Sequence, residues 1–310
     1  MRASARQSPN SQSVPLLDQF LTDEAGIDAL CRHLYSLTGI FLPPSSKNRH
    51  LVVSRLSSLL RKHRWSSLRS YLKELEGRPV HDPLNSEFIS ALTTNTTQFF
   101  REPAHYEFLA RALPGYLEEK CAQLSSDSNE LRIWCAAAST GQEPLSILML
   151  VQHELQKQAA LRRAWRLKFL ASDIDEAVLE KASRGVFLEH ETQGLSPELR
   201  ERYFIPAIGG EISPGAIRAH PELLSKLSFA RINLTESPYP FSHPFDVVFL
   251  RNVLIYFDTA TVSKVIDEMG KIIRPGGLLF LGHSESGCMR NSKFKSISHA
   301  VYRRVREGER

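Results

Sequence analysis

The chain has 310 residues, a formal net charge of +5 and a pI near 9.0. Its length allows two domains, and its 42% hydrophobic and 24% charged residues are ordinary for a soluble globular protein. No run approaches the roughly 18 apolar residues of a membrane span, and the start lacks the apolar core of a signal peptide. We therefore expect a cytoplasmic protein without membrane insertion, whose mild positive charge suits an acidic partner without singling out nucleic acid.

The four cysteines lie far apart and form no CxxC pair. This spacing predicts free thiols and supports neither a disulfide framework nor a zinc site. Residues 1–19 are polar and predict a disordered tail.

Residues 20–92 predict a helical domain. In the first helix the apolar residues recur at spacings of three and four, at Ile27, Leu30, Leu34 and Leu37. A second helix is expected to start near Ser45 and to bury one apolar side, formed by Leu51, Val52, Leu56, Leu59 and Leu60. A third helix is expected to end at Gly77, because glycine suits a helix C-cap.

The second helix also carries a basic face over 47–64, formed by Lys47, Arg49, Arg55, Arg61, Lys62 and Arg64. Two interpretations remain open, a solvated helix surface and a docking surface for an acidic partner. No aromatic residues alternate with these charges, so single-stranded nucleic acid is not the expected partner.

Residues 93–130 are expected to join the two domains. Here the polar run 93–97 interrupts the helical pattern and leads into Phe99, Phe100 and Arg101. Short polar side chains can cap a helix, which is one interpretation of the run. The other is a binding role, because ligand sites are common where domains meet.

Residues 131–147 predict a buried strand, a turn of small residues and an amphipathic helix. This is the first unit of a doubly wound α/β sheet, in which ligands bind at the carboxyl ends of the strands. The small residues Ala136, Ala137, Ser139 and Gly141 would let a ligand approach the backbone, or would simply let strand and helix pack closely. The turn is not a GxGxxG dinucleotide motif.

A second strand is expected to end near Asp173. An acidic residue at this position typically binds ribose hydroxyls, although the 32 residues from Gly141 exceed the usual spacing of about 20. The alternative is a cap on the next helix, and we expect Asp173 to serve the ribose and Asp175 the cap.

Residues 186–230 break the α/β pattern and predict an inserted small sheet with a hairpin turn at Gly209-Gly210. Further strands are expected in LSFARINL, ending at Asn233, in FDVVFL, in LLFLGHSES and near SHAVYRRV. The helix before LLFLGHSES is expected to end at RPGG.

Five stretches together resemble the chemotaxis receptor methyltransferase family (CheR). They are TTNTTQFFRE at 93–102, WCAAASTGQEPLSI at 134–147, ASDIDEAVLEKASRGVF at 171–187, FDVVFLRNVLIYFD at 245–258 and PGGLLFLGHSE at 275–285. The resemblance implies an all-helical N-terminal domain followed, over 131–310, by a class I (Rossmann-like) methyltransferase domain with a small β-subdomain inserted at about 186–230. It also implies S-adenosylmethionine as cofactor, with S-adenosylhomocysteine as product.

The resemblance implies a role for ten residues. Those expected to contact the cofactor are Asn95, Thr97, Arg101, Glu143, Asp173, Asn233, Leu234, Asn252 and Val253. Of these, Glu143 would meet the amino group and Asp173 the ribose. Tyr256 would stand at the methyl-transfer site with Arg101, which would orient either the cofactor or the substrate carboxylate. The sequence departs from the family pattern at Gln142, where a glutamate is usual, and at Cys135, where serine is common.

The implied reaction is methyl esterification of glutamate side chains on the cytoplasmic helices of chemoreceptors. These helices present acidic surfaces, which favours docking by the basic face; a monomer is the default expectation. Two other hypotheses are a cofactor-binding regulatory module without turnover and a methyltransferase acting on nucleic acid or a small molecule. The intact Arg101, Glu143 and Asp173 argue against the first. The absence of an NPPY-like motif argues against the second.

Overall fold

The structure is a computed structural model that describes residues 20–123, 129–160, 164–207, 215–306 and 308. The predicted tail at 1–19 and the predicted turn at Gly209-Gly210 lie outside these residues. The chain forms two compact units, one from the described residues up to 37 with 42–92 and the other from 38–41 with 93–310. No helix in the described part of the chain combines the length and apolar character needed to cross a membrane.

The first unit is helical, as predicted. Its elements are α2 (Glu24–Thr38), α3 (Ser46–Lys62), α4 (Leu68–Glu76) and α5 (Pro83–Leu92). Ser45 and Ser67 cap α3 and α4 by accepting backbone N–H groups, and Gly77 is the C-cap of α4. One prediction is wrong: Leu51 is exposed and Val53 is buried in its place. The buried stripe of α3 runs through positions 52/53, 56 and 59/60, and Leu51 lies off this stripe.

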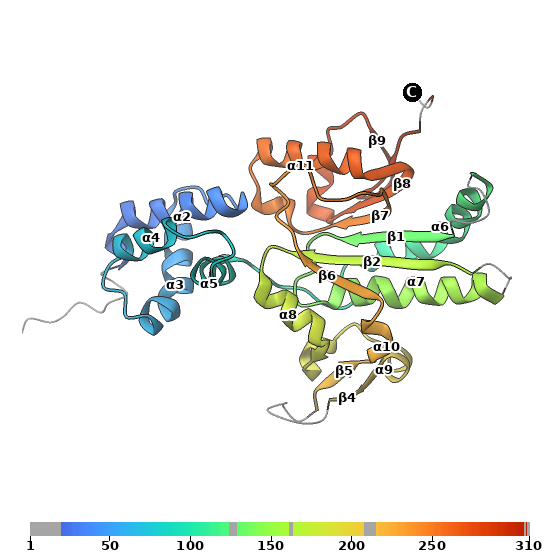
Figure 1. The fold of residues 1–310 in the computed structure, drawn as a ribbon, viewed down its shortest axis with the longest axis horizontal. Helices are drawn as coiled ribbons and strands as arrows, with labels where there is room; N and C mark the ends of the chain where they lie inside the picture. Colours follow the sequence, from blue (N-terminus) through green and yellow to red (C-terminus); the bar gives the residue numbers. More distant parts are fainter. Residues whose placement is uncertain (1–19, 124–128, 161–163, 208–214, 307, 309–310) are drawn as a thin grey trace, which may run out of the picture. The chain divides into compact units, whose positions relative to one another are not determined.

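The second unit contains a seven-stranded sheet in the order β6-β2-β1-β7-β8-β10-β9 (Figure 1). The parallel strands are β6 (Leu227–Arg231), β2 (Arg166–Asp173), β1 (Glu130–Cys135), β7 (Phe245–Leu250) and β8 (Ile273–Leu281). β10 (Val301–Arg304) is antiparallel to both β8 and β9 (Phe294–Ser298). The strand order reverses at β1, so β1 and β7 flank the switch point where ligands bind in such sheets.

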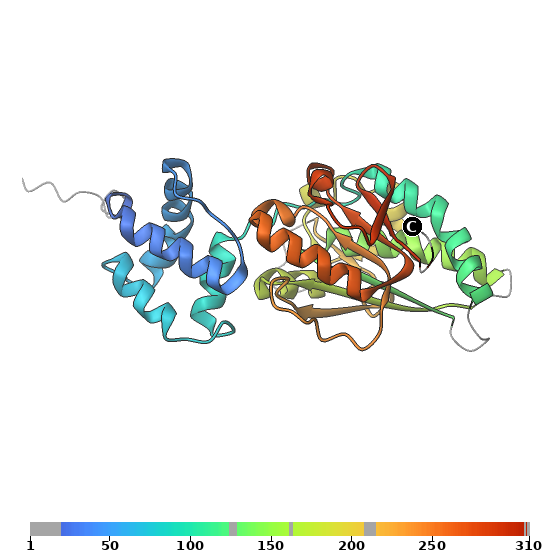
Figure 2. The same ribbon diagram turned by 90° about the horizontal axis from the view of Figure 1, so that it is seen from above.

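Helices cover both faces of this sheet. Alternate residues of β1 enter two separate cores, with Ile133 in one and Trp134 in the other. The first core includes apolar residues of α6 (Pro103–Gln123) and α7 (Gln142–Ala160), and the second those of α11 (Thr259–Ile272). α11 lies over the sheet on the face opposite α7 (Figures 1 and 2). α8 (Glu176–Arg184) follows β2 and ends at the left-handed Gly185.

The predicted small sheet is present, in the order β3-β5-β4. Its strands are β3 (Val186–Phe187), β4 (Phe204–Pro206) and β5 (Ile217–Ala219), all paired antiparallel. Three short helices accompany it, namely η1 (Glu189–Thr192), α9 (Pro197–Tyr203) and α10 (Pro221–Leu224).

Three predictions in the C-terminal half need correction, and one strand there was not predicted. β6 ends at Arg231, two residues before the predicted end, because the chain turns at Asn233. RPGG lies inside β8: α11 ends at Ile272, and the glycines coincide with an irregularity in the β7–β8 register. β8 ends at Leu281, and HSES begins a short helix, η3 (His283–Cys288). Strand β9 was not predicted, because its pattern FKSIS is mostly exposed.

Candidate functional site

The turn after β1 is fixed by backbone conformation. Ser139 has a φ of +47° and Gly141 a φ of +100°, and a Cβ at Gly141 would lie 3.1 Å from the Cα of Ala182. Gly141 therefore serves the close packing of the turn against α8, which is one of the two interpretations of the small residues. Ala137, Ser139 and Thr140 are partly exposed at the carboxyl edge of the sheet.

Asp173 ends β2 beside this turn. Its carboxylate accepts the backbone N–H of Ser139 at 2.8 Å and that of Asp175 at 3.1 Å. Burial raises the pKa of Asp173 to about 6, against the opposing effect of these N–H donors. The carboxylate keeps lone pairs for further donors, since each of its oxygens can accept more than one hydrogen bond.

Asp175 has the predicted capping role and a second one. It caps α8 by accepting the N–H of Ala177, and it also accepts the Thr93 hydroxyl at 3.0 Å and the Asn95 amide at 2.9 Å. The polar run 93–97 does not cap α6, which begins only at Pro103. Its residues instead anchor the segment to the end of β2, where the Ser139 hydroxyl also donates to the Asn95 carbonyl.

A buried arginine joins the next part of the site. The Arg251 side chain has no exposed surface and donates to Glu143 at 2.9 Å and to Glu102 at 3.0 Å. It also donates to the backbone carbonyl of Arg101 at 2.6 Å, so one guanidinium holds the segment 101–102 against the start of α7. Burial raises the pKa of Glu143, and the charge of Arg251 opposes this increase.

The turn after β7 is held by another buried carboxylate. Glu285 in η3 accepts the N–H groups of Asn252, Leu254 and Gly282 at 2.8, 2.7 and 2.6 Å. Asn252 has a φ of +56°, so these bonds secure a strained conformation. Burial raises the pKa of Glu285, although its N–H donors act in the opposite direction.

The remaining predicted residues lie along the same edge. Val253 precedes the short helix η2 (Leu254–Tyr256), in which the backbone carbonyl of Tyr256 accepts the N–H of Phe41 at 2.8 Å. Asn233 follows β6 and closes a turn by accepting the N–H and the hydroxyl of Thr235. Leu234 is buried, and its carbonyl accepts the Tyr239 hydroxyl at 2.7 Å. Thr97 is half-buried.

The structure thus links four of the ten predicted residues into two hydrogen-bonded groups. Asn95 and Asp173 belong to the hydrogen-bonded group at the end of β2, and Glu143 and Asn252 belong to the group around Arg251 and Glu102. Across the sheet, the edge runs from Asn233 after β6, past Asp173 and the β1 turn, to Asn252 after β7.

Three residues of this site, Glu102, Arg251 and Glu285, were not predicted. Each lies inside one of the stretches that carry the family resemblance: Glu102 in FFRE, Arg251 in FLRN and Glu285 in GHSE. The one weak signal for Glu285 is its position three residues after Gly282, whose backbone N–H it accepts, although glycine has no side chain to complete a capping box. Burial of Arg251 and Glu102 gives no such signal, because local sequence does not show that two charges will be buried as a pair.

Comparison with known proteins identifies a family for this chain. Residues 95–303 match the model of the CheR methyltransferase SAM-binding domain, and residues 25–93 match that of the CheR methyltransferase all-alpha domain. The chain is 34% identical over 302 residues to the chemotaxis protein methyltransferase of Escherichia coli (strain K12), covering 97% of this chain and 98% of that protein. It is 37% identical over 269 residues to chemotaxis protein methyltransferase 2 of Pseudomonas aeruginosa, covering 87% and 89%.

The sheet order, the polar carboxyl edge and the matching domain define a methyltransferase that uses S-adenosylmethionine. The chain belongs to the CheR methyltransferase family, and its function is methylation in chemosensory signalling.

Proposed function

We propose that this protein methylates glutamate side-chain carboxylates of chemoreceptors and so forms glutamyl methyl esters. The family membership supports methyl transfer in chemotaxis. The choice of a carboxylate as acceptor is supported by Arg101, which lies on the segment that Arg251 holds at the carboxyl edge.

The Arg101 guanidinium is half-buried and available for an anion. Among the described residues, its side chain makes one hydrogen bond, to the backbone carbonyl of Thr96 at 3.1 Å. A guanidinium carries five N–H donors in a planar fork that matches a carboxylate, so most of them remain for a ligand. In this proposal Arg101 orients the receptor glutamate, or the cofactor carboxylate beside it.

The residues along the edge fit the cofactor by their chemistry. Asp173 offers a carboxylate to the ribose hydroxyls, and Asn233 with Leu234 flank the adenine position at the end of β6. Asn95, Thr97, Asn252 and Val253 would complete the cofactor site, with Glu143 for the amino group. Glu143 is already paired with Arg251, so we propose that it contacts the amino group with its second oxygen. When bound, S-adenosylmethionine supplies a methyl group activated by its sulfonium charge.

The acceptor requires little catalytic machinery. A glutamate carboxylate has an unperturbed pKa of about 4.3 and is ionised at neutral pH, so no general base has to remove a proton. The task of the protein is then to align the reacting groups and exclude water, and positioning of this kind can supply about 7–11 kcal/mol. Tyr256, in the turn that Glu285 secures, is proposed to line the transfer site.

We propose that the receptor docks on the exposed part of the basic face of α3. Arg49 pairs with Asp28 and Glu24, and Arg55 donates to the Leu92 carbonyl. These two cations stabilise the helical unit. Lys62 pairs with Glu87 at the surface. The exposed cations left to meet an acidic receptor helix are Lys47, Arg61 and Arg64.

In this proposal the helical domain at 20–92 docks on the receptor and 93–130 connects it to the methyltransferase domain at 131–310. The insertion at about 186–230 adds a second contact with the cytoplasmic region of the receptor. The protein would then act in the cytoplasm as a monomer.

The test is transfer of tritiated methyl from S-adenosylmethionine to membranes that contain chemoreceptors. We expect label on the receptors that is released as methanol by mild base, because carboxyl methyl esters hydrolyse under these conditions and methylated amines do not. Label that resists base would contradict the proposed acceptor. Binding of S-adenosylhomocysteine without any transfer, across a panel of receptors, would favour a regulatory module without turnover.

A further inference from the structure

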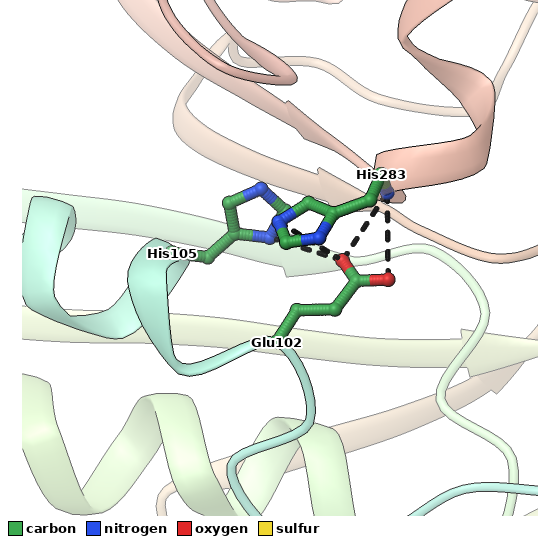
Figure 3. Close-up of side chains that lie close together, drawn as sticks. All are labelled: Glu102, His105 and His283. Atoms are coloured by element: carbon green, nitrogen blue, oxygen red, sulfur yellow. Dashed lines mark hydrogen bonds and ion pairs between the residues drawn. The ribbon is translucent and has the colours of Figure 1, made fainter.

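A cluster of two histidines and one glutamate lies next to the proposed cofactor site (Figure 3). Glu102 and His105 stand at the beginning of α6, and His283 begins η3. The carboxylate of Glu102 points toward both imidazole rings in Figure 3. Its Oε2 lies 3.5 Å from His105 Nδ1 and 3.9 Å from His283 Nε2. The three donor atoms all lie within 4.8 Å of one another.

A tetrahedral metal ion would need ligand atoms somewhat closer together than these, which a rotation of the partly exposed His283 side chain would provide. Zinc binds histidine nitrogen and carboxylate oxygen at about 2.0–2.2 Å, which places neighbouring ligand atoms about 3.4 Å apart. Two nitrogens and one oxygen, with a fourth position for water, are a donor set that favours zinc or cobalt over magnesium or calcium. Glu102 directly precedes α6 with a φ of +59°, and His105 lies in the first turn of that helix.

His105 supplies an independent indication of a ligand. Its side chain is 1% exposed, and its ring nitrogens meet no strict hydrogen-bond geometry among the described residues, although Glu102 lies 3.5 Å from Nδ1 and the backbone of His299 lies near the ring. Buried polar groups are nearly always well satisfied, so a buried imidazole with only long contacts has room for a closer ligand. The ring packs edge-on against Phe280 and His283, so Nδ1 stays directed toward Glu102.

A metal ion could reach this cluster from solvent. The side chain of His283 is 41% exposed, whereas that of Glu102 is 15% exposed. The ring of His299 lies 4.8 Å from that of His283 between centroids, close enough to add a fourth nitrogen ligand after a side-chain rotation.

We propose that Glu102, His105 and His283 form a binding site for a divalent transition metal, with Zn²⁺ as the ion that the donors suit best. No metal site is expected from the sequence, because the cysteine spacing supports none and His105 and His283 lie far apart along the chain.

Occupancy of this site would inhibit methyl transfer. Oε2 of Glu102, which faces both histidines, also pairs with Arg251 at 3.0 Å, so the metal ion and the guanidinium compete for one oxygen. Arg251 in turn holds Glu143 and the carbonyl of Arg101. A metal ion on Glu102 therefore weakens the arrangement that supports the cofactor, and by linkage the cofactor weakens metal binding by the same factor.

The first test is titration of the tag-free full chain with Co²⁺, followed by visible absorption. We expect one equivalent to bind with the bands of a low-symmetry four- or five-coordinate site, and Zn²⁺ to displace it. His283→Ala should abolish the signal, and His105→Gln provides a second variant inside the cluster. His243→Ala, at an exposed histidine elsewhere on the second unit, is the matched control and should keep the signal. Circular dichroism checks that each variant is folded.

The second test measures the affinity for S-adenosylhomocysteine by calorimetry with and without saturating Zn²⁺. We expect Zn²⁺ to weaken binding at least threefold in the wild type and to have no effect in His283→Ala. Absence of the Co²⁺ signal, or its persistence in both His283→Ala and His105→Gln, would overturn the site. Metal binding that leaves the cofactor affinity unchanged would overturn the inhibition. Neither readout depends on which side chain the enzyme methylates.

Discussion

The two edges of the main sheet each bury an ionic cluster, but they differ in what the cluster holds. At the amino edge, Asp246 is fully buried and accepts the Lys120 ammonium at 2.7 Å, the Tyr116 hydroxyl at 2.6 Å and the Arg132 N–H at 2.7 Å. All of these groups stand on regular elements, so the cluster connects α6 and β1 with β7. Every partner there is part of the scaffold.

At the carboxyl edge, the Arg251 side chain instead donates to residues that lie in turns. Six described non-glycine residues have positive φ, and four of them, Phe100, Glu102, Ser139 and Asn252, lie in the turns at this edge. Such conformations cost about 1–3 kcal/mol each and persist where surrounding structure imposes them. The carboxylates of Glu285 and Asp173 and the guanidinium of Arg251 impose them here.

The comparison shows that a buried ion pair does not by itself mark a functional site. The amino-edge cluster contributes to the stability of the scaffold. The carboxyl-edge cluster fixes strained turns that carry partly exposed groups beside the proposed cofactor position, which is the property expected of an active site.

Removing one cation from each edge is the strongest test of this difference between the two clusters. Lys120→Met and Arg251→Met should both lower the free energy of unfolding by about 3–5 kcal/mol, because each removes the nearest cation from a buried carboxylate, and Asp246 keeps only the Arg274 guanidinium at 3.1 Å. In urea titrations the two variants should therefore look alike.

Their activities should differ. At a temperature where both are folded, Arg251→Met should lose at least tenfold in methyl transfer, and Lys120→Met should stay within twofold of the wild type. Equal activities in the two variants would remove the distinction between the edges.

Arg101→Ala tests the carboxyl edge without removing a buried charge. Its half-buried side chain makes one hydrogen bond among the described residues, so the free energy of unfolding should change by less than about 1 kcal/mol. Methyl transfer should fall at least tenfold, with Arg101→Lys recovering part of the loss. Near-normal kcat/KM in Arg101→Ala would exclude Arg101 from the site.

Asp173→Ala should weaken binding of S-adenosylhomocysteine about tenfold, measured by calorimetry, because the ribose hydroxyls lose their acceptor. Asp267→Ala, at an exposed carboxylate on α11, is the control and should leave the affinity unchanged. An unchanged affinity in Asp173→Ala would leave Asp173 as a residue that only orders the β1 turn.

The pH dependence of the affinity for S-adenosylhomocysteine tests the role of Asp173 further. The pKa of Asp173 is raised to about 6, so its carboxylate gains a proton as the pH falls through 6 and then accepts ribose hydroxyls less well. Affinity for S-adenosylhomocysteine should therefore decrease below pH 6 in the wild type, and this decrease should be absent in Asp173→Asn. The sign for stability is the opposite: burying the charged form costs folding free energy above pH 6, and the cost is relieved as the pH falls toward 3.8.

The smallest effect is expected from the basic face of α3. Arg61→Glu should lower kcat/KM for receptor methylation about threefold at low salt, with less effect at high salt and none on cofactor affinity. Lys264→Glu, at an exposed position of α11, is the charge-matched control. If Arg61→Glu behaves like Lys264→Glu, the basic face is only solvated.

The sequence predicted those parts of the fold that have a local signal. The strand, small-residue turn and helix at 131–147 were found because buried alternation, turn chemistry and helical periodicity agree there. The cap at Asp175 was found for the same reason. The helix before RPGG ends at Ile272, within two residues of the predicted stop, but RPGG itself was not expected to lie in β8, because its glycines serve a register irregularity between β7 and β8 that only the paired strands reveal.

Many polar residues of the site were predicted, the buried Glu143 among them, but three charged residues that hold its turns were missed. Asp173 and Asn252 follow apolar strands, and this position marks them. Arg251, Glu102 and Glu285 depend on contacts between segments more than 30 residues apart. Periodicity and spacing carry no information about such pairings.

The central claim is that the carboxyl edge between β2 and β7 binds the cofactor. The most direct measurement is a crystal structure of the full chain with S-adenosylhomocysteine. We predict its ribose hydroxyls on the Asp173 carboxylate, its adenine beside Asn233 and Leu234, and its amino-acid end near Glu143 and Arg251. Ligand density elsewhere, or a ribose that makes no contact with Asp173, would contradict the account.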